Sequence, residues 1–310
     1  MGLTSKIKEA IKKPTLAFTW LSVHGFLNFV PDKTYLKIAY SLSLKKKLNL
    51  KNPQTFNEKL QWLKLYDRKP EYAKMVDKYE VREYIASKIG EEYLIPLVGG
   101  PWNSFDEIDF HKLPDQFVLK TTHDSGGVVI CRNKAEFDKD RAKTLLTKSL
   151  NHSFFWRGRE WPYKNCKPRI IAEKYMEDSG NAGTITDYKF YCFGGKPEFL
   201  YISEGLENHA TAHISFVTLD WNFAKYGRSD YMPYDVLPEK PSCFEDMLKV
   251  CCELSDGHAF LRVDLYQINS KIYFSELTFF PCSGLMPFKN KEHDLELGKM
   301  VNIQGVEANV

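Results

Sequence analysis

The sequence of 310 residues contains no pair of cysteines with Cys-x-x-Cys spacing, and its seven cysteines are odd in number. Both features argue against a disulfide scaffold and against a zinc ribbon. We therefore expect free, buried thiols in a protein of the reducing cytoplasm. The chain also lacks an uninterrupted apolar run of the roughly 18 residues that a membrane-spanning helix requires.

A large excess of charge of one sign is absent as well. The formal net charge is only +3, which argues against a surface built to bind nucleic acid. A single local pocket for an anionic ligand remains compatible with this composition.

The N-terminal segment combines lysines with an apolar stretch but lacks a clear targeting signal. Lys6, Lys8, Lys12 and Lys13 precede the mixed stretch 16–30. Polar residues interrupt that stretch, and no small-residue cleavage site follows it, as a secretory signal would require. The pattern favours an ordinary surface helix. The alternative is a basic amphipathic helix that touches the inner face of a membrane.

Residues 1 to about 90 are predicted to be helical. Thr55 can cap a helix, and Glu58, three residues later, completes a capping box. A further helix is expected from Met75 to Ile89, ended by Gly90.

From Tyr93 onward the pattern changes to short apolar strands, beginning with a run over 93–98 that 99–101 (GGP) closes. The later segments predicted as strands are 116–120, 127–131, 169–176, 187–193, 198–202, 260–265 and 271–277, with a helix over 247–255. Strands mixed with helices indicate an α+β fold.

The loop between the strands 116–120 and 127–131 is rich in small residues. Ser125, Gly126 and Gly127 would let backbone N–H groups approach anionic oxygens, and Lys120 adds a positive charge. The loop is not a Walker motif, because Gly-Lys-Ser/Thr is absent. A tight hairpin turn with no ligand explains these residues equally well.

Two carboxylates lie inside apolar strand-like runs near the C-terminus. A buried Asp264 or Glu276 is costly without a partner, and two on paired strands would repel each other unless a cation lay between them. Magnesium, which binds carboxylate and phosphate oxygens, would suit the pair. Salt bridges to Arg262 or Lys271 on a sheet surface are the alternative. Asp187 and Lys189, taken alone, fit a plain hairpin.

Together these segments resemble the ATP-grasp superfamily, and more closely the TupA-like group associated with teichuronopeptide and other surface-polysaccharide biosynthesis. The resemblance runs from about residue 52 to about residue 284. Its clearest stretches are 55–62 (TFNEKLQW), 117–127 (FVLKTTHDSGG) and 274–281 (FSELTFFP).

The resemblance implies a fold in which two α+β lobes sandwich ATP, with a helical N-terminal region added. It suggests a helical region over 1–110, a lid subdomain over 111–173 and a metal-binding catalytic subdomain over 174–310. ATP would be held by lysines, the glycine loop, a hinge segment and a ribose-binding acid. These implied ATP-binding residues are Lys78, Lys120, Ser125, Gly126, Gly127, Glu173, Lys174, Tyr175, Met176 and Asp187.

The resemblance also assigns the chemistry. Lys189 and Arg262 would neutralise charge during phosphoryl transfer, and Asp264 and Glu276 match the two magnesium carboxylates. Many members have Asn two residues after the second carboxylate. Here that position is Thr278, a weaker ligand, so the number of metal ions is open.

The implied activity is an ATP- and Mg²⁺-dependent carboxylate–amine ligase that works through an acyl phosphate. A uronic acid of a glycan and a small amine are the implied substrates, with His123, Arg228 and Ser283 as candidate contacts. One alternative is a sugar kinase on the same scaffold. A glycosyltransferase, which would usually carry an Asp-x-Asp metal motif, is the other.

Overall fold

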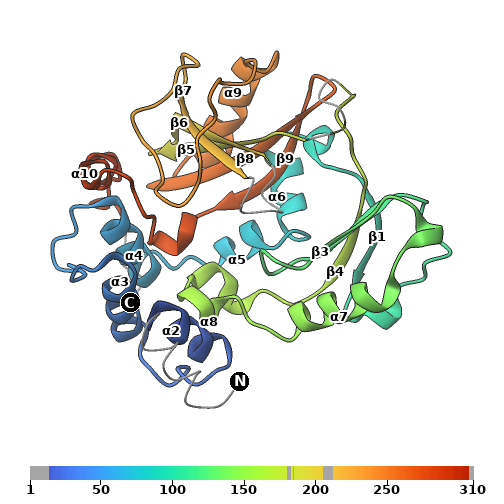
Figure 1. The fold of residues 1–310 in the computed structure, drawn as a ribbon, viewed down its shortest axis with the longest axis horizontal. Helices are drawn as coiled ribbons and strands as arrows, with labels where there is room; N and C mark the ends of the chain where they lie inside the picture. The colour runs from blue at the N-terminus through green and yellow to red at the C-terminus, as the bar shows by residue number, and fades with distance from the viewer. Residues whose placement is uncertain (1–13, 180–182, 184, 205–211, 307–310) are drawn as a thin grey trace.

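The computed structural model describes residues 14–179, 183, 185–204 and 212–306 (Figure 1). The helices are α2 (Pro14–Val23), α3 (Asp32–Leu44), α4 (Phe56–Tyr66), α5 (Glu71–Val76), α6 (Val81–Lys88), α7 (Lys139–Leu150), α8 (Phe155–Gly158), α9 (Phe244–Ser255) and α10 (Lys291–Met300). The strands are β1 (Leu97–Trp102), β2 (Phe117–Thr121), β3 (Val128–Cys131), β4 (Ile170–Lys174), β5 (Asp187–Phe193), β6 (Lys196–Glu204), β7 (His213–Thr218), β8 (Phe260–Ile268) and β9 (Lys271–Thr278). Short 3₁₀ turns are η1 (Glu91–Tyr93), η2 (Phe105–Glu107), η3 (Lys134–Glu136), η4 (Trp161–Asn165) and η6 (Pro281–Gly284).

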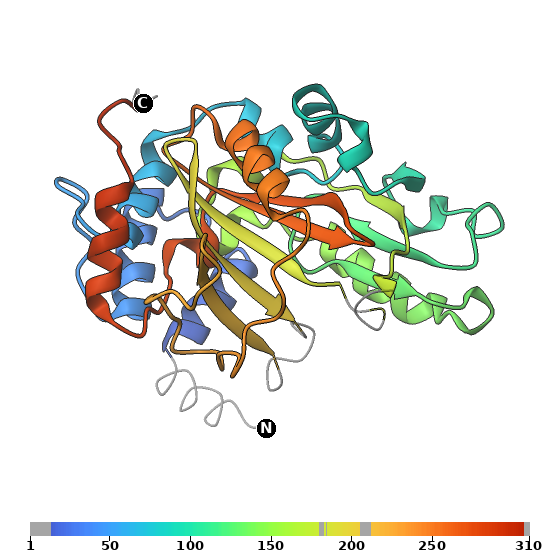
Figure 2. The same ribbon diagram turned by 90° about the horizontal axis from the view of Figure 1, so that it is seen from above.

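The strands form two separate antiparallel sheets, which confirms the predicted α+β class. A four-stranded sheet has the order β1-β4-β2-β3, and a five-stranded sheet has the order β7-β6-β5-β8-β9. Figures 1 and 2 show the two sheets side by side, with α2, α3, α4 and α10 gathered at the end away from the four-stranded sheet. The division into regions 1–110, 111–173 and 174–310 stays a prediction.

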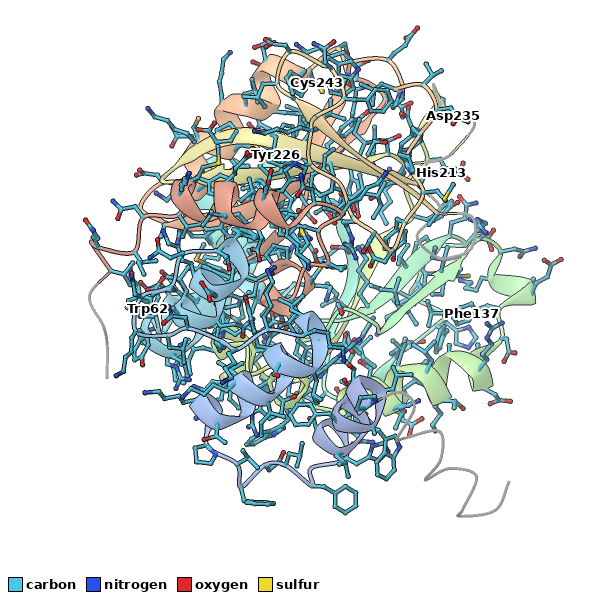
Figure 3. The ribbon with its side chains drawn as sticks, turned by 60° about the vertical axis from the view of Figure 1, so that its left-hand side comes forward. Trp62, Phe137, His213, Tyr226, Asp235 and Cys243 are labelled. Carbon is cyan, nitrogen blue, oxygen red and sulfur yellow. The ribbon has the colours of Figure 1, made fainter. Side chains whose placement is uncertain are left out.

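Each sheet buries one face against a helix. In the four-stranded sheet, Phe117 and Leu119 pack toward α7, and the Phe137 ring, labelled in Figure 3, lies 5.3 Å from that of Phe117. In the five-stranded sheet, Phe190 faces Phe244 of α9 at 5.8 Å between ring centroids. Because side chains alternate across a strand, the neighbouring residues of these strands point away from α7 and α9, to the opposite face of each sheet.

Helix α4 joins the N-terminal region to the five-stranded sheet. Phe56 is fully buried, and its ring lies 4.9 Å from that of Phe260 on β8. The predicted capping box is confirmed, because the Thr55 hydroxyl accepts from the Glu58 backbone N–H at 3.2 Å while the Glu58 carboxylate accepts from the Thr55 N–H at 3.1 Å. Helix α10 packs against the start of α4, where the carboxylate of Asp294 accepts from the Asn57 N–H at 2.9 Å.

The single helix expected over 75–89 is wrong, because the chain breaks it into α5 and α6. Asp77 has an extended backbone, with φ −77° and ψ 120°. Its carboxylate accepts the backbone N–H groups of Tyr79 and Glu80 at 2.9 Å, and also the Thr122 hydroxyl at 2.8 Å. An Asp side chain that bonds neighbouring N–H groups competes with continuous helix, and here it ends one helix and starts the next.

Three other expectations concern the N-terminus and the cysteines. All seven cysteines are free, as predicted, but only Cys131, Cys192 and Cys251 are buried, and Cys252 is exposed. Lys6, Lys8, Lys12 and Lys13 lie outside the described residues. Among the helices of the described ranges, none is both long and apolar enough to cross a bilayer.

Strand β1 differs from expectation, since it includes the 99–101 segment that was predicted to close the apolar run.

Gly298 tests the docking of α10 on α4. A methyl group at Gly298 would overlap the backbone of Gln54 and Thr55. We expect Gly298→Ala to lower the free energy of unfolding by about 1–3 kcal/mol, because overpacking forces the two helices apart. Thermal and urea unfolding measure this change. Gly305→Ala, where an added methyl group meets no atom within 4 Å, is the control. Equal stability of the two variants would contradict the tight contact.

Candidate functional site

The sheet register brings together charged residues that are far apart in sequence. In the five-stranded sheet Lys189 pairs with Asp264, Asp264 pairs with Glu276, and Arg262 pairs with Thr278. Residues directly opposite each other on neighbouring strands point to the same face. These five residues, together with Asp187, therefore share the face opposite to α9, and we call them the central cluster.

Within the central cluster the charged groups are in direct contact. The Lys189 ammonium donates to Asp264 Oδ2 at 2.7 Å and also contacts Asp187. The Arg262 guanidinium donates to both oxygens of Asp264 at 2.6 and 2.7 Å, to Glu276 Oε1 at 2.8 Å and to the Thr278 hydroxyl at 2.9 Å. The sequence alternative of a salt bridge to Arg262 is thus present, but in a buried network instead of on an open surface.

Burial and mutual contact set the charges of this cluster. Burial opposes the charged form of Lys189, yet Asp187 and Asp264 raise its pKa well above the ordinary value. Burial likewise opposes ionisation of Glu276, but Arg262, Lys189 and Lys78 lower its pKa to about 2. Lys189 is therefore a cation and Glu276 an anion at neutral pH.

Two more lysines approach the cluster from other parts of the fold. Lys78 lies in the break between α5 and α6, where its N–H donates to the Thr122 carbonyl at 2.9 Å and its ammonium contacts the Asp124 carbonyl. Lys120, on β2, forms an ion pair with Glu173 on β4 at 2.5 Å. Burial opposes the charge of Lys120, but Glu173 raises its pKa.

The glycine loop after β2 is anchored at one end and open at the other. Asp124 accepts from the Thr121 hydroxyl at 2.5 Å and from the Gly127 N–H at 3.2 Å, and it contacts Ser149 of α7. A side chain at Gly127 would overlap the Thr121 hydroxyl, whereas one at Gly126 would meet nothing within 4 Å. The residue between the anchor and Gly126, Ser125, is exposed.

Three adjoining cavities run between the two sheets and on to the N-terminal helices. The first, of about 330 Å³, shares Lys120 and Glu173 with the second, of about 290 Å³. The second shares Ser125 and Glu276 with the third, of about 520 Å³. Because each cavity shares wall residues with the next, the three lie next to one another.

The first cavity lies between the two sheets and has an apolar part. Val128 and Ile130 line it although 42% and 49% of their surfaces are exposed. The predicted hinge residues Glu173, Lys174, Tyr175 and Met176 line it from β4 onward, and Asp187 lines it from β5. The structure thus brings these hinge residues and Asp187 together around one cavity.

The second cavity is lined by the residues with which a polyanion could be neutralised. Lys78, Lys120, Ser125 and Glu276 all contribute to its wall. Arg82, which the sequence analysis missed, lines it too and lies 3.7 Å from Glu173. The sequence gave no sign that Arg82 belongs to the site, because an arginine within a predicted helix, four residues after Lys78, is common.

The third cavity joins the central cluster to the N-terminal helices. Arg262, Glu276 and Thr278 line it on one side, and Arg228 and Ser283, both predicted as substrate contacts, line it as well. The sequence analysis also missed wall residues from distant segments. These are Thr15, Thr19, Tyr35, Lys64, Arg157, Glu160 and Tyr163.

Each of the three candidate substrate contacts has a partner in the protein. Arg228 forms a two-pronged pair with Asp230 at 2.6 and 2.8 Å. The Ser283 hydroxyl accepts from the Lys64 ammonium at 2.9 Å. His123 is buried, shares a hydrogen bond with the His152 carbonyl at 3.0 Å, and lines none of these three cavities. The structure therefore brings Arg228 and Ser283 to the site but leaves His123 apart from it.

The donor set of the central cluster fits magnesium better than zinc. Asp264, Glu276 and Thr278 offer only oxygen atoms, which Mg²⁺ prefers. The described residues hold no group of three His, Cys, Asp or Glu side chains that could bind a metal. One or two carboxylates suffice for Mg²⁺ when phosphate oxygens complete its ligands, so the set matches a metal that arrives with a nucleotide.

Comparison with known proteins identifies the family of the chain. A family model described as "TupA-like ATPgrasp" matches residues 58–302, which is more than half of the chain. No curated protein matches the chain. Similar solved structures include D-alanine–D-alanine ligase from Bacillus anthracis complexed with ATP (16% identity, TM-score 0.38, 66% of this chain and 55% of that chain).

Two other similar structures have comparable scores. They are D-alanyl-alanine synthetase A from Vibrio cholerae O1 biovar eltor (12% identity, TM-score 0.40, 79% and 63%) and the ATP-grasp ligase PsnB complexed with a minimal precursor variant, Mg and ADP (9% identity, TM-score 0.37, 68% and 52%). The chain thus spans 52–63% of the length of these three structures. On the family match, the chain belongs to the TupA-like ATP-grasp family.

Proposed function

We propose that this protein is an ATP- and Mg²⁺-dependent carboxylate–amine ligase. The observation that carries the proposal is the position of the central cluster, whose Glu276 lines both the second and the third cavity. A triphosphate in the second cavity would therefore end beside a substrate in the third. We propose the predicted site residues in the roles given above, with His123 left out.

The first cavity suits an adenine base. Val128, Ile130 and Met176 supply apolar surface for a flat ring, and pockets of this kind combine apolar walls with a few polar groups that fix orientation. Glu173 and Asp187 are the polar groups, placed for the base and the ribose hydroxyls. Covering Val128 and Ile130 would also remove apolar surface from water.

Catalysis in this proposal depends on charge and alignment. The substrate carboxylate attacks the γ-phosphorus, the bond to the ADP oxygen breaks, and an acyl phosphate forms. The amine nitrogen then bonds to the carbonyl carbon, phosphate leaves, and the nitrogen loses its proton to solvent. Lys189 and Arg262 stay cationic and are held by Asp264, so they are preorganised toward the charge of the transferring group.

Magnesium, when bound at Asp264, Glu276 and Thr278, would neutralise phosphate charge. The chain's own loop has a different task. Ser125 lies on the wall shared by the second and third cavities, so an inward movement of this loop would exclude water from the reacting groups. Asp124, which ties the loop to Thr121 and Ser149, would act as the fixed end of that movement.

The acceptor is proposed to be a glycan or small-molecule carboxylate, with a uronic acid as the specific candidate. The walls of the third cavity support this choice, because they combine hydroxyl groups with cations. Thr15, Thr19 and Ser283 provide hydroxyls, and Arg157 and Arg228 provide positive charge. Hydroxyls suit a sugar ring, and arginine suits a carboxylate.

The deciding experiment is product analysis. The full chain is incubated with ATP, Mg²⁺, single uronic acids and single amines, and phosphate release is followed before products are examined by mass spectrometry. A ligase gives an amide together with ADP and phosphate, and chelation of the metal stops the reaction. Formation of a sugar phosphate without an amide would favour the kinase, and transfer of a sugar would favour the glycosyltransferase.

Glu276→Gln tests the metal site with little change in shape. Because the amide cannot supply a full negative charge, ATP turnover should fall by about 10²-fold or more. Because Glu276 loses its ion pair with Arg262 but its side chain is 40% exposed, thermal unfolding should stay cooperative, with a midpoint lowered by only a few degrees. Glu198→Gln, at an exposed position of β6, is the matched control. Turnover equal to that of the control would remove Glu276 from the proposed site.

Lys120→Ala tests the contact with the phosphates. Loss of this cation from the second cavity should raise the Kd for ATP about tenfold or more, since a charge-assisted hydrogen bond contributes roughly 1.5–3 kcal/mol. Calorimetric titration with ATP and Mg²⁺ gives the Kd, and Lys271→Ala, at the exposed start of β9, is the control. An unchanged affinity would argue against a phosphate contact at Lys120.

A further inference from the structure

The segment 14–30 exposes large apolar side chains without any charge of its own. It contains no Asp, Glu, Lys or Arg. Leu16, Trp20, Phe26 and Phe29 are 62%, 54%, 57% and 84% exposed, and Leu21 is exposed as well. Five of the fourteen exposed large apolar side chains of the described residues thus lie in one short segment, which we call the apolar ridge.

The apolar ridge is held by a well-packed scaffold. Phe18 packs on Tyr35 of α3 at 4.8 Å, and the Tyr35 hydroxyl donates to Ser22 at 2.9 Å. The turn after α2 is fixed by the buried Arg159, whose guanidinium donates to the Leu27 carbonyl at 2.7 Å. One side of the segment is therefore packed against the rest of the protein. This packing fixes the positions of the side chains that are exposed on the other side.

Two of the exposed aromatic rings lie next to each other. The rings of Trp20 and Phe26 stack with their centroids 5.7 Å apart, and Leu16 precedes Trp20 by one helical turn. Contiguous exposed apolar surface of this kind marks an interaction site. Trp and Phe beside a basic region are typical of segments that lie in the headgroup layer of a membrane.

Lysines are frequent in the residues that follow the ridge. Residues 14–51 contain six lysines and one acidic residue, Asp32. All six lysines are exposed; they are Lys33, Lys37, Lys45, Lys46, Lys47 and Lys51. Asp32 is already paired with Arg68 at 2.7 Å. The segment 14–51 therefore combines an excess of exposed positive charge with its exposed apolar side chains.

We propose that the α2–α3 segment docks on an anionic membrane surface, with the apolar ridge in the headgroup layer and the lysines toward lipid phosphates. Each lysine near such a surface adds electrostatic attraction to anionic headgroups. A second copy of the chain is a poorer occupant, because a symmetric dimer would bring the two lysine groups together. The segment lies outside the family match at 58–302. The proposed docking therefore involves a part of the chain that the family model does not cover.

Docking would bring the third cavity close to the membrane. Thr15 and Thr19 of α2 line that cavity, and Tyr35 and Leu36 of α3 line it too. An acceptor attached to lipid could then reach the central cluster without leaving the surface. This consequence rests on the proposed function, whereas the docking itself does not.

The test is co-sedimentation of the full chain with vesicles. One set contains phosphatidylcholine with phosphatidylglycerol, and the other contains phosphatidylcholine alone. We expect binding to the anionic set that weakens with added salt, and a loss of about tenfold or more in affinity for Trp20→Ser/Phe29→Ser. Val236→Ser, at another highly exposed apolar position (79%), should bind like the unaltered chain.

A second variant separates charge from apolar contact. Lys33→Gln/Lys37→Gln should weaken binding to the anionic vesicles while its thermal stability stays that of the unaltered chain. The proposal is overturned if the full chain binds neither vesicle set, or if Trp20→Ser/Phe29→Ser binds as well as the Val236→Ser control. It is also overturned if sedimentation shows a dimer that this double variant converts to monomer, since the ridge would then bind a second copy.

Discussion

The carboxylate of Asp264 is the contact on which the candidate site depends. It is fully buried, and it accepts hydrogen bonds from Lys189 on one neighbouring strand and from Arg262 on its own strand. Removing a carboxylate from water is costly unless cations and hydrogen bonds replace the water. Here the carboxylate is satisfied by the same cations that the proposed chemistry needs, so the demands of stability and of function coincide at one residue.

This arrangement also explains how so many charges can share one sheet face. The carboxylates Asp264 and Glu276 lie opposite each other on β8 and β9, and the guanidinium of Arg262 contacts both, while Lys189 contacts Asp264 from β5. A site with fixed, paired charges has little to reorganise when a polyanion enters. Lys78 and Lys120, which come from outside the sheet, add positive charge on the side where the second cavity lies.

The N-terminal helices take part in the site although they precede the family match. Helices α2 and α3 line the third cavity, and Arg159 ties them to the segment after α8. Arg159 is almost completely buried and its guanidinium lies over the rings of Tyr35 and Trp156. Tyr226 (Figure 3) packs between Phe199 of β6 and His293 of α10. This contact links the five-stranded sheet to α10.

Local patterns in the sequence determined much of the fold. The capping box at Thr55 and Glu58 depends on residues three positions apart, and the strands β5 and β8 are dense in apolar and aromatic residues, so both could be read directly. The helix break at Asp77 could not, because it depends partly on Thr122, which is 45 residues away. The role of Lys78 follows from that break.

Tertiary structure alone decided which side chains share a cavity. Asp264 and Glu276 were recognisable as unusual because carboxylates in apolar runs need partners, but only the folded structure showed that the Arg262 guanidinium contacts both of them. Arg82, Lys64 and Arg157 sit in ordinary helical surroundings, and only packing brings them to the cavities. His123 shows the converse, since it lies beside the glycine loop in sequence but points to the His152 carbonyl. Sequence determines which residues are costly to bury, whereas the fold determines what they meet, because those contacts form between segments far apart along the chain.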